Sequence, residues 1–179
     1  MRCMLIMKID LKKYIREIPD WPKKGILFRD ITPLLADSQA LAAATDALCA
    51  DFTGSAIDYV AAVEARGFIL GSAVAQKLGA GFIPIRKQGK LPGQTERISY
   101  ELEYGSDTLE VHRDAVGAGG CVLMVDDLLA TGGTMASACL LIEKIGGKIA
   151  GIAFLVELAE LHGRDRLTGY KIKSVISYK

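Results

Sequence analysis

Signatures of several common protein classes are missing from this sequence of 179 residues. It has no Walker A pattern (G-x-x-x-x-G-K-[ST]), which argues against a P-loop NTPase, and no G-x-G-x-x-G dinucleotide fingerprint. No two cysteines have the C-x-x-C spacing, and three of the four lie in apolar strand or helix patterns. We therefore expect buried, reduced thiols. The cysteines are Cys3, Cys49, Cys121 and Cys139.

The chain also lacks a surplus of either charge. It has 22 Lys and Arg against 21 Asp and Glu, which does not favour nucleic-acid binding as the main role. The apolar stretch 1–7 is too short for the core of a signal peptide or for a membrane span. We expect a cytoplasmic protein with no nucleic-acid or membrane partner. His112 and His162 stand alone and are expected on the surface or in loops, not as metal ligands.

Length and apolar content suit one domain, 1–179, with a sizeable core. Strand-like and helix-like segments alternate, which predicts an α/β fold with a mainly parallel, twisted sheet flanked by helices. The predicted strands are 59–63, 82–86, 108–111, 121–125, 149–156 and 172–178. The predicted helices are 9–17, 38–53, 70–78 and 134–145.

The most informative segment is 121–134, which reads as a buried strand, an acidic pair and a small Gly/Thr loop that opens a helix. We expect Asp126 and Asp127 where the strand ends, at the edge where open α/β sheets bind ligands. In the loop 130–134, glycines let backbone N–H groups turn toward one point, and the threonine hydroxyls can donate as well. The helix N-terminus adds partial positive charge there, so the pattern predicts a phosphate site.

The acidic pair indicates what else the ligand carries. Two carboxylates would repel a phosphate unless they face adjacent ribose hydroxyls or a Mg²⁺ ion. A ligand with a phosphate and a diol a few ångströms apart, such as a ribose 5-phosphate, fits both requirements. The alternative for Asp126-Asp127 alone is an ordinary strand-to-helix turn with Asp as a cap.

Two further segments place anion-binding chemistry at predicted strand ends. Segment 64–68 (Glu-Ala-Arg-Gly-Phe) offers Arg66, which can fork to two phosphate oxygens, and Gly67, which lets the backbone approach a ligand. Segment 86–90 carries three positive charges. Taken alone, the first could be a surface turn with an exposed ion pair and the second a solvated face. Together with the loop 130–134 they favour a ligand that has a pyrophosphate as well as a phosphate.

A long polar stretch, 87–105, is predicted to be a lid loop, because such loops in compact domains are usually functional. It contains Gly89, Pro92, Gly93 and Gly105. We expect the part 88–102 to be mobile and to close over the ligands.

The run 125–134 strongly resembles the motif that binds 5-phosphoribosyl 1-pyrophosphate (PRPP) in the type I phosphoribosyltransferases. Four further segments resemble parts of the members that use adenine. Segment 22–35 resembles their base-binding segment, and segment 64–68 resembles their pyrophosphate loop. Segments 86–92 and 99–105 resemble the two borders of their lid. The similarity covers roughly residues 8–178. Lys24 departs from it, since these proteins often have Pro there.

The resemblance implies a type I phosphoribosyltransferase fold with an N-terminal base-binding hood, 1–36, and the lid 87–105. Glu103 would handle the proton on the purine imidazole ring, and Tyr104 would help to close the lid. Phe28 would stack on adenine, with Leu27 and Leu158 as apolar walls and backbone groups near Arg29 reading the amino edge. The implied PRPP contacts are Arg66, Arg86, Lys87, Lys90, Asp126, Asp127, Ala130, Thr131, Gly132, Gly133 and Thr134.

The implied activity is transfer of the phosphoribosyl group from PRPP to adenine, giving AMP and pyrophosphate, a reaction of purine salvage. Mg²⁺ would be held mainly by PRPP near Asp126 and Asp127, without a direct protein ligand, and the enzyme would be a homodimer. One alternative is a related enzyme for hypoxanthine, xanthine or orotate, although segment 27–29 and the pair Glu103-Tyr104 favour adenine. Another is a PRPP-sensing transcription regulator, but such proteins carry an added DNA-binding domain.

Overall fold

The computed structural model describes residues 9–102 and 105–179, which fall into two compact units, Met1–Ala44 and Thr45–Lys179. The predicted hood 1–36 lies within the first unit, and the remaining sequence motifs lie in the second. No helix in the described part of the chain is both long and apolar enough to cross a membrane.

The N-terminal unit contains a short antiparallel hairpin. A 3₁₀ turn, η1 (Leu11–Tyr14), leads into β1 (Arg16–Pro19), which pairs with β2 (Leu27–Asp30). Helices α1 (Thr32–Ala36) and α2 (Ser38–Cys49) follow, and α2 runs into the second unit. The predicted helix 9–17 is therefore wrong: the backbone is already extended at Ile15, and Arg16 donates to Asp30 on the opposite strand at 3.0 Å.

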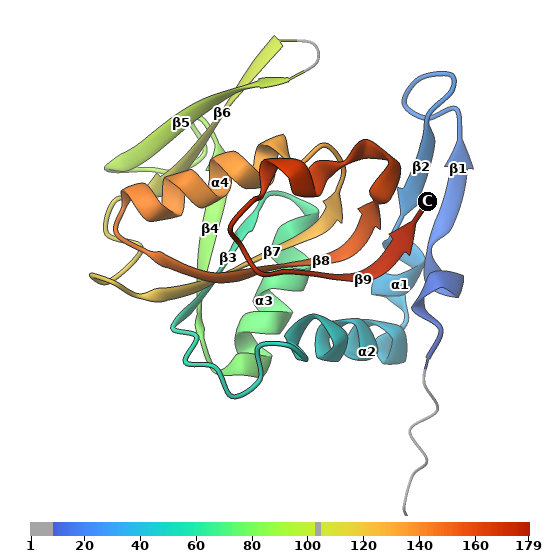
Figure 1. Cartoon of the computed structure of the whole chain (residues 1–179), viewed down its shortest axis with the longest axis horizontal. Coiled ribbons are helices and arrows are strands. Elements are labelled where there is room, and N and C mark those ends of the chain that lie inside the picture. The colour runs from blue at the N-terminus through green and yellow to red at the C-terminus, as the bar shows by residue number, and fades with distance from the viewer. Residues whose placement is uncertain (1–8, 103–104) are drawn as a thin grey trace, which may run out of the picture. The chain divides into compact units, whose positions relative to one another are not determined.

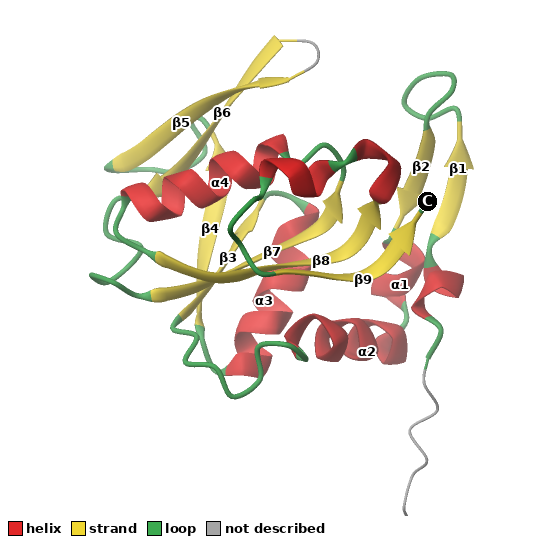
Figure 2. Ribbon diagram, viewed as in Figure 1, coloured by secondary structure: helices red, strands yellow, loops and turns green. Residues whose placement is uncertain are grey.

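The C-terminal unit is built on one seven-stranded sheet (Figures 1 and 2). Its strand order is β5-β6-β4-β3-β7-β8-β9. The five neighbouring strands β4, β3, β7, β8 and β9 are parallel. At one edge of the sheet, β6 is antiparallel to β4 and to β5. This confirms the predicted mainly parallel α/β fold. The strands are β3 (Tyr59–Val63), β4 (Gly81–Lys87), β5 (Thr95–Leu102), β6 (Gly105–His112), β7 (Cys121–Leu129), β8 (Lys148–Leu158) and β9 (Ile172–Tyr178).

Helices cover both faces of this sheet (Figure 2). Gly71 of α3 (Arg66–Leu78) approaches the side chain of Ala62, whereas Ala61 belongs to the buried cluster that contains Met135 and Ile142 of α4 (Gly133–Lys144). Neighbouring strand residues point to opposite faces, so α3 and α4 pack on opposite sides. Burial on both faces explains the continuous apolar run of β7.

Two element boundaries and two additional short turns differ from the prediction in ways that shape the site. Strand β7 continues through the acidic pair to Leu129, because Leu128 and Leu129 still pair with β8. Helix α3 begins at Arg66 rather than near residue 70, so Arg66 lies in its first turn. Short 3₁₀ turns η2 (Ala159–Leu161) and η3 (Gly163–Arg166) follow β8.

The predicted lid loop is mostly a β-hairpin. Lys87 ends β4, a turn follows, and β5 pairs with β6 from Thr95↔His112 to Leu102↔Gly105. The expectation of a loop over 87–105 is therefore wrong for 95–102. Ile98 and Tyr100 alternate with polar residues and pack against the buried cluster, which is a strand pattern that charged neighbours concealed.

Candidate functional site

Two of the sequence motifs meet in one cavity of about 300 Å³ in the C-terminal unit. Its walls come from the carboxyl ends of the adjacent parallel strands β3 and β7 and from the first turns of α3 and α4. This is the edge at which open α/β sheets bind ligands. The lining residues are Val63, Glu64, Ala65, Arg66 and all residues from Asp126 to Met135.

One arginine, Arg66, forms an ion pair with the acidic pair Asp126-Asp127 in this cavity. Arg66 Nε lies 2.7 Å from Asp127 Oδ2, and the Asp127 N–H donates to Asp126 Oδ1 at 2.9 Å. Burial and the negative charge of Asp127 raise the pKa of Asp126 well above its usual range. Burial also raises the pKa of Asp127, although the Arg66 guanidinium opposes this. The pair therefore attracts hydroxyl donors or a cation strongly.

The loop 130–134 connects β7 to α4 with backbone N–H groups at a helix N-terminus. Gly132 has a φ of +81°, which L side chains rarely adopt, and the helix starts at the next residue. The first-turn N–H groups of a helix lack intrahelical partners. They can therefore bind a phosphate, as the sequence predicted.

A segment that the sequence analysis did not identify packs against this loop. A Cβ on Gly132 would meet the carbonyl oxygen of Gly163, and a Cβ on Gly163 would meet the carbonyl oxygen of Ala130. Arg164 fixes this segment by donating to both carboxylate oxygens of the buried Glu157 at 2.7 Å. No local pattern in 159–169 indicates such a contact, which depends on the tertiary packing of η3 on the loop.

Two of the other predicted cations, Arg86 and Lys87, lie near the cavity through their contacts with Glu64. Arg86 Nη2 lies 3.0 Å from Glu64 Oε2, and the Lys87 N–H donates to Glu64 Oε1 at 2.8 Å. Lys87 Nζ lies 2.9 Å from Asp107 Oδ2. Arg86, Lys87 and Lys90 do not line the cavity. Glu64, part of its wall, links Arg86 and Lys87 to it.

Strand β5 contacts the loop 130–134 directly. The Thr134 hydroxyl lies 3.4 Å from the Tyr100 hydroxyl, which in turn lies 3.5 Å from Asp107 Oδ2. The hairpin that replaces the predicted lid loop is thus connected to the loop 130–134. Glu103 and Tyr104, the predicted catalytic residues, lie outside the described residues.

The predicted adenine-binding residues of the N-terminal unit, Leu27, Phe28 and Arg29, are consecutive residues of β2, so Leu27 and Phe28 point to opposite faces of the hairpin. Leu27 is 42% exposed and Trp21 is 51% exposed. The ring of Phe28 contacts that of Trp21 edge-to-face, with centroids 4.4 Å apart. Arg29 forms an ion pair with Glu17 on β1. In the other unit, Leu158 is the last, half-buried residue of β8.

The donor set around the cavity suits a cation held largely by a ligand. Among the described residues, no group of three His, Cys, Asp or Glu side chains is arranged to hold a metal ion. Asp126 and Asp127 offer carboxylate oxygens, which Mg²⁺ prefers, and Mg²⁺ usually keeps several waters or substrate oxygens. The cavity residues therefore fit a Mg²⁺ ion that is shared with a phosphorylated substrate.

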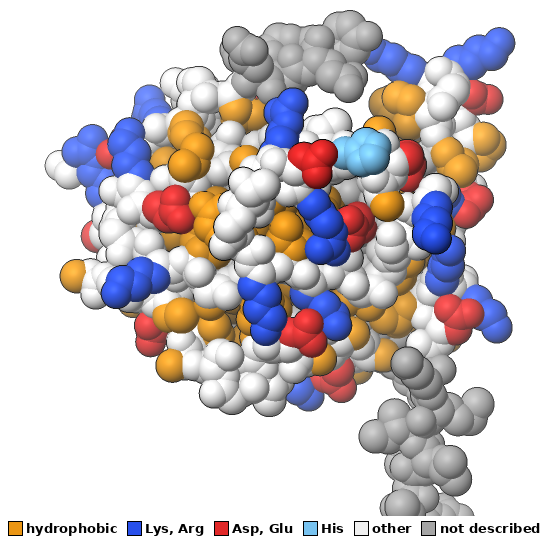
Figure 3. Space-filling model, in the orientation of Figure 1, with side chains coloured by type: hydrophobic (Ala, Val, Ile, Leu, Met, Phe, Trp, Pro, Cys, Tyr) orange, Lys and Arg blue, Asp and Glu red, His pale blue; other side chains and the backbone are white. Residues whose placement is uncertain are grey.

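The cysteines and the surface charge follow the sequence analysis in most respects. Cys49 and Cys139 are buried free thiols, and burial raises the pKa of Cys139 to about 12, whereas Cys121 is half-buried. On the face shown in Figure 3, Lys and Arg side chains alternate with Asp and Glu side chains.

Comparison with known proteins gives consistent matches over nearly the whole chain. The phosphoribosyl transferase domain model matches residues 33–178. Adenine phosphoribosyltransferase of Thermotoga neapolitana is 55% identical over 95% of this chain and 100% of its own length. Adenine phosphoribosyltransferase of Thermoanaerobacter pseudethanolicus has a similar structure, with a TM-score of 0.91, 52% identity and coverage of 94% of this chain and 98% of its own.

A second similar structure contains ligands. Adenine phosphoribosyltransferase of Saccharomyces cerevisiae, complexed with adenine and an imino-altritol bisphosphate, has a TM-score of 0.87 and 38% identity. The match covers 92% of this chain and 96% of the yeast chain.

Proposed function

The chain belongs to the adenine phosphoribosyltransferases of the phosphoribosyl transferase family, and from this premise we propose that it converts PRPP and adenine to AMP and pyrophosphate. The observation that carries the proposal is the single cavity in which the acidic pair, the loop 130–134 and Arg66 lie together. These groups suit a diol, a phosphate and a pyrophosphate in that order. The reaction belongs to purine salvage.

The loop 130–134 would hold the 5-phosphate through N–H groups at the start of α4 and the hydroxyls of Thr131 and Thr134. Asp126 and Asp127 would accept hydrogen bonds from the ribose hydroxyls. Arg66 would exchange part of its contact with Asp127 for the pyrophosphate, whose charge it can meet with two N–H groups. Arg86, Lys87 and Lys90 would add positive charge on the same side.

Mg²⁺ would be held by PRPP and its waters beside Asp126 and Asp127, where it supplies charge that stabilises the departing pyrophosphate. The bond between the base nitrogen and the anomeric carbon forms as the bond to pyrophosphate breaks. Protein residues contribute positioning and charge stabilisation rather than covalent chemistry. Glu103 would accept the proton that leaves the imidazole ring of the base.

The apolar side chains of β2 support a purine as the base, and the groups that face its polar edge would decide which purine. Phe28 offers a ring for stacking, and Leu27 offers an apolar wall. The alternative bases hypoxanthine and xanthine carry a carbonyl where adenine carries its amino group. Backbone acceptors near Arg29 would favour the amino group of adenine over such a carbonyl.

The experiment combines purified protein, PRPP, Mg²⁺ and adenine, and measures AMP and pyrophosphate by chromatography. The proposal predicts equal amounts of both products, and loss of both when the cation is chelated. Formation of pyrophosphate without AMP would instead indicate PRPP hydrolysis and contradict the proposal.

A homodimer and a cytoplasmic location complete the proposal. Light scattering on the purified protein should give twice the chain mass of 19.2 kDa. A single chain mass at micromolar concentration would contradict the dimer. Fractionation of source cells should recover the protein in the cytoplasmic fraction.

A further inference from the structure

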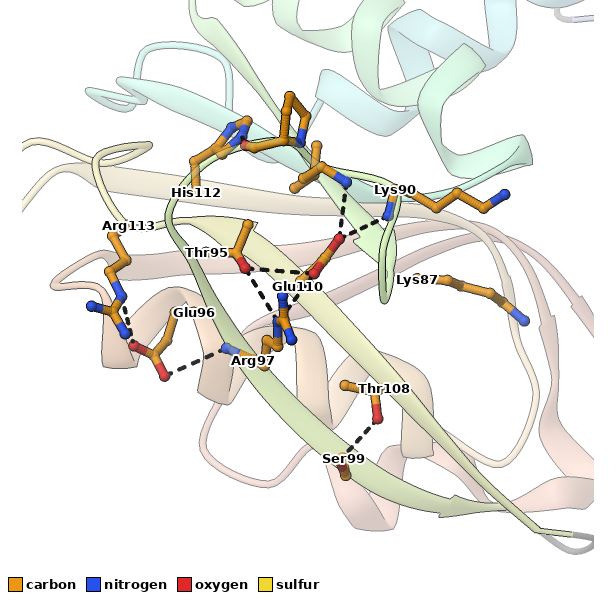
Figure 4. Close-up of polar contacts among 12 residues, drawn as sticks. Lys87, Lys90, Thr95, Glu96, Arg97, Ser99, Thr108, Glu110, His112 and Arg113 are labelled. Atoms are coloured by element: carbon orange, nitrogen blue, oxygen red, sulfur yellow. Dashed lines mark hydrogen bonds and ion pairs between the residues drawn. The ribbon is translucent and has the colours of Figure 1, made fainter.

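A fully buried carboxylate, Glu110 of β6, fastens the turn between β4 and β5 (Figure 4). Its Oε1 accepts the backbone N–H groups of Lys90 and Leu91, both at 2.9 Å. Its Oε2 lies 3.2 Å from Arg97 Nε and 3.5 Å from the Thr95 hydroxyl. Four donors from the turn and from β5 thus converge on one side chain.

A charge at this position needs a reason, because Glu110 is fully buried. Its strand neighbours Leu109 and Val111 point to the opposite face and are fully buried apolar residues. A buried carboxylate is costly unless hydrogen bonds compensate it, and apolar replacement of buried charges is often neutral or stabilising. Burial by itself raises the pKa of Glu110, but the N–H groups of Leu91 and Lys90 and the charge of Arg97 outweigh it and lower the pKa overall. Glu110 therefore stays ionised at neutral pH and holds its donors firmly.

The turn that Glu110 fastens is connected to the cavity. Arg86 lies opposite Glu110 in the β4–β6 pairing, and Arg86 Nη1 donates to the carbonyl oxygen of Lys90 at 3.2 Å. The other end of the Arg86 guanidinium contacts Glu64, which lines the cavity beside Arg66. A continuous chain of polar contacts thus runs from Glu110 through Lys90 and Arg86 to Glu64.

We propose that Glu110 is a positioning residue for the pyrophosphate half of the site, acting through the turn 88–91. It does not line the cavity and acts by fixing the backbone that orients Arg86, Lys87 and Lys90. Cations held in place before the substrate arrives bind it without losing conformational freedom at that moment. The inference rests on the proposed function, because it assigns these cations to pyrophosphate.

The test compares Glu110→Gln with wild type, using two ligands that occupy different halves of the site. Gln keeps the size of Glu but removes the charge, so the hydrogen bonds from the N–H groups of Lys90 and Leu91 become weaker and the turn 88–91 is held less firmly. The proposal predicts a rise of roughly tenfold, equivalent to about 1.4 kcal/mol, in the Kd for Mg²⁺-pyrophosphate and in the KM for PRPP. The Kd for AMP, which lacks the pyrophosphate, should stay within about twofold of wild type.

The matched control is Glu96→Gln on the same hairpin. Glu96 pairs with Lys144 at 2.7 Å. It also pairs with Arg113 at 3.5 Å, away from the turn 88–91 (Figure 4). The Glu96→Gln variant should leave the affinities for both ligands unchanged.

A second test variant, Arg97→Gln, removes one exposed partner of Glu110. It should give a smaller rise, roughly threefold, in the Kd for Mg²⁺-pyrophosphate alone. This variant decides the question if Glu110→Gln does not fold.

Several outcomes separate this inference from the proposed function. Equal losses for AMP and pyrophosphate in both test variants would mean that Glu110 is merely structural, and unchanged pyrophosphate binding would also overturn the inference. If wild type binds pyrophosphate and responds to the variants but forms no AMP from PRPP and adenine, the proposed reaction alone is wrong. If wild type does not bind pyrophosphate at all, both are wrong.

Discussion

The carboxylate of Asp126 occupies the space that a side chain on Gly67 would need. A Cβ built on Gly67 would lie 2.6 Å from Asp126 Oδ1, well inside van der Waals contact. Gly67 sits in the first turn of α3, and Asp126 sits near the end of β7. The glycine therefore lets the helix start beside the acidic pair, rather than only letting the backbone approach a ligand as the sequence suggested.

Replacing Gly67 by Ala should displace Asp126 and lower kcat/KM for PRPP by roughly ten- to hundredfold, as small misplacements at an active site do. Gly117→Ala is the matched control, because the nearest atom to a Cβ there is the Tyr59 hydroxyl at 3.6 Å. Steady-state kinetics on both variants checks the prediction. Equal activity of Gly67→Ala and wild type would show that Asp126 does not need its position.

Asp126→Asn should cost activity and add stability. Loss of a charged acceptor for a ribose hydroxyl predicts a roughly ten- to hundredfold fall in kcat/KM. Burial and the charge of Asp127 raise the pKa of Asp126, so the folded state binds this proton more tightly than the unfolded state, and stability falls as pH rises above the ordinary Asp range. At pH 7 the free energy of unfolding of the variant should exceed that of wild type by about 0.5–2 kcal/mol. This difference should vanish toward pH 4. Denaturant unfolding at both pH values measures this, and a pH-independent difference would contradict it.

Gly163→Ala should weaken binding at the 5-phosphate and spare the pyrophosphate. A Cβ at this position meets the Ala130 carbonyl and lies 2.8 Å from Leu129 Cδ1, so the loop 130–134 must move. We expect the Kd for AMP to rise roughly tenfold or more, with Mg²⁺-pyrophosphate binding within about twofold of wild type. Calorimetry with each ligand gives the comparison. For Glu110→Gln we expect the opposite, a weaker affinity for Mg²⁺-pyrophosphate and an unchanged affinity for AMP. If both variants lost affinity for the same ligand, the 5-phosphate half and the pyrophosphate half of the site would not be supported separately.

The hairpin β5–β6 should still act as a lid, although it is not the loop that was predicted. Hydrogen exchange over 92–102 should be fast in the free protein and slower with PRPP and an unreactive base analogue, whereas the N–H groups of Lys90 and Leu91, which Glu110 holds, should be protected in both states. Glu103→Gln should lower kcat more than it raises the KM for PRPP, because Glu103 is expected to handle a proton and not a phosphate. Identical exchange with and without ligands would mean that the hairpin is fixed.

The parts of the site that depend on short, contiguous motifs could be predicted from the sequence. The run 121–134 specified a buried strand, an acidic pair and a helix start, and the structure places them in the cavity. Arg66 was identified because its motif follows a strand whose carboxyl end lies beside that of β7.

The parts that depend on contacts between distant segments could not be predicted. The charged residues in 95–102 concealed the alternation that makes β5 a strand, and only its pairing with β6 reveals it. Gly163 and Glu110 are separated in sequence from the groups they support, and no local pattern distinguishes them. The partner of Arg66 was also not anticipated, since its pairing with Asp127 follows from the helix beginning four residues early.

The most direct test of the central claim is a competition for PRPP. Purified protein, limiting PRPP and Mg²⁺ are mixed with equal concentrations of adenine, hypoxanthine and guanine, and the nucleotides formed are separated and counted. The account predicts that AMP makes up nearly all of the product, because a site built to hydrogen-bond one edge of a base rejects bases that leave its polar groups unpaired. A mixture dominated by IMP or GMP would contradict the account.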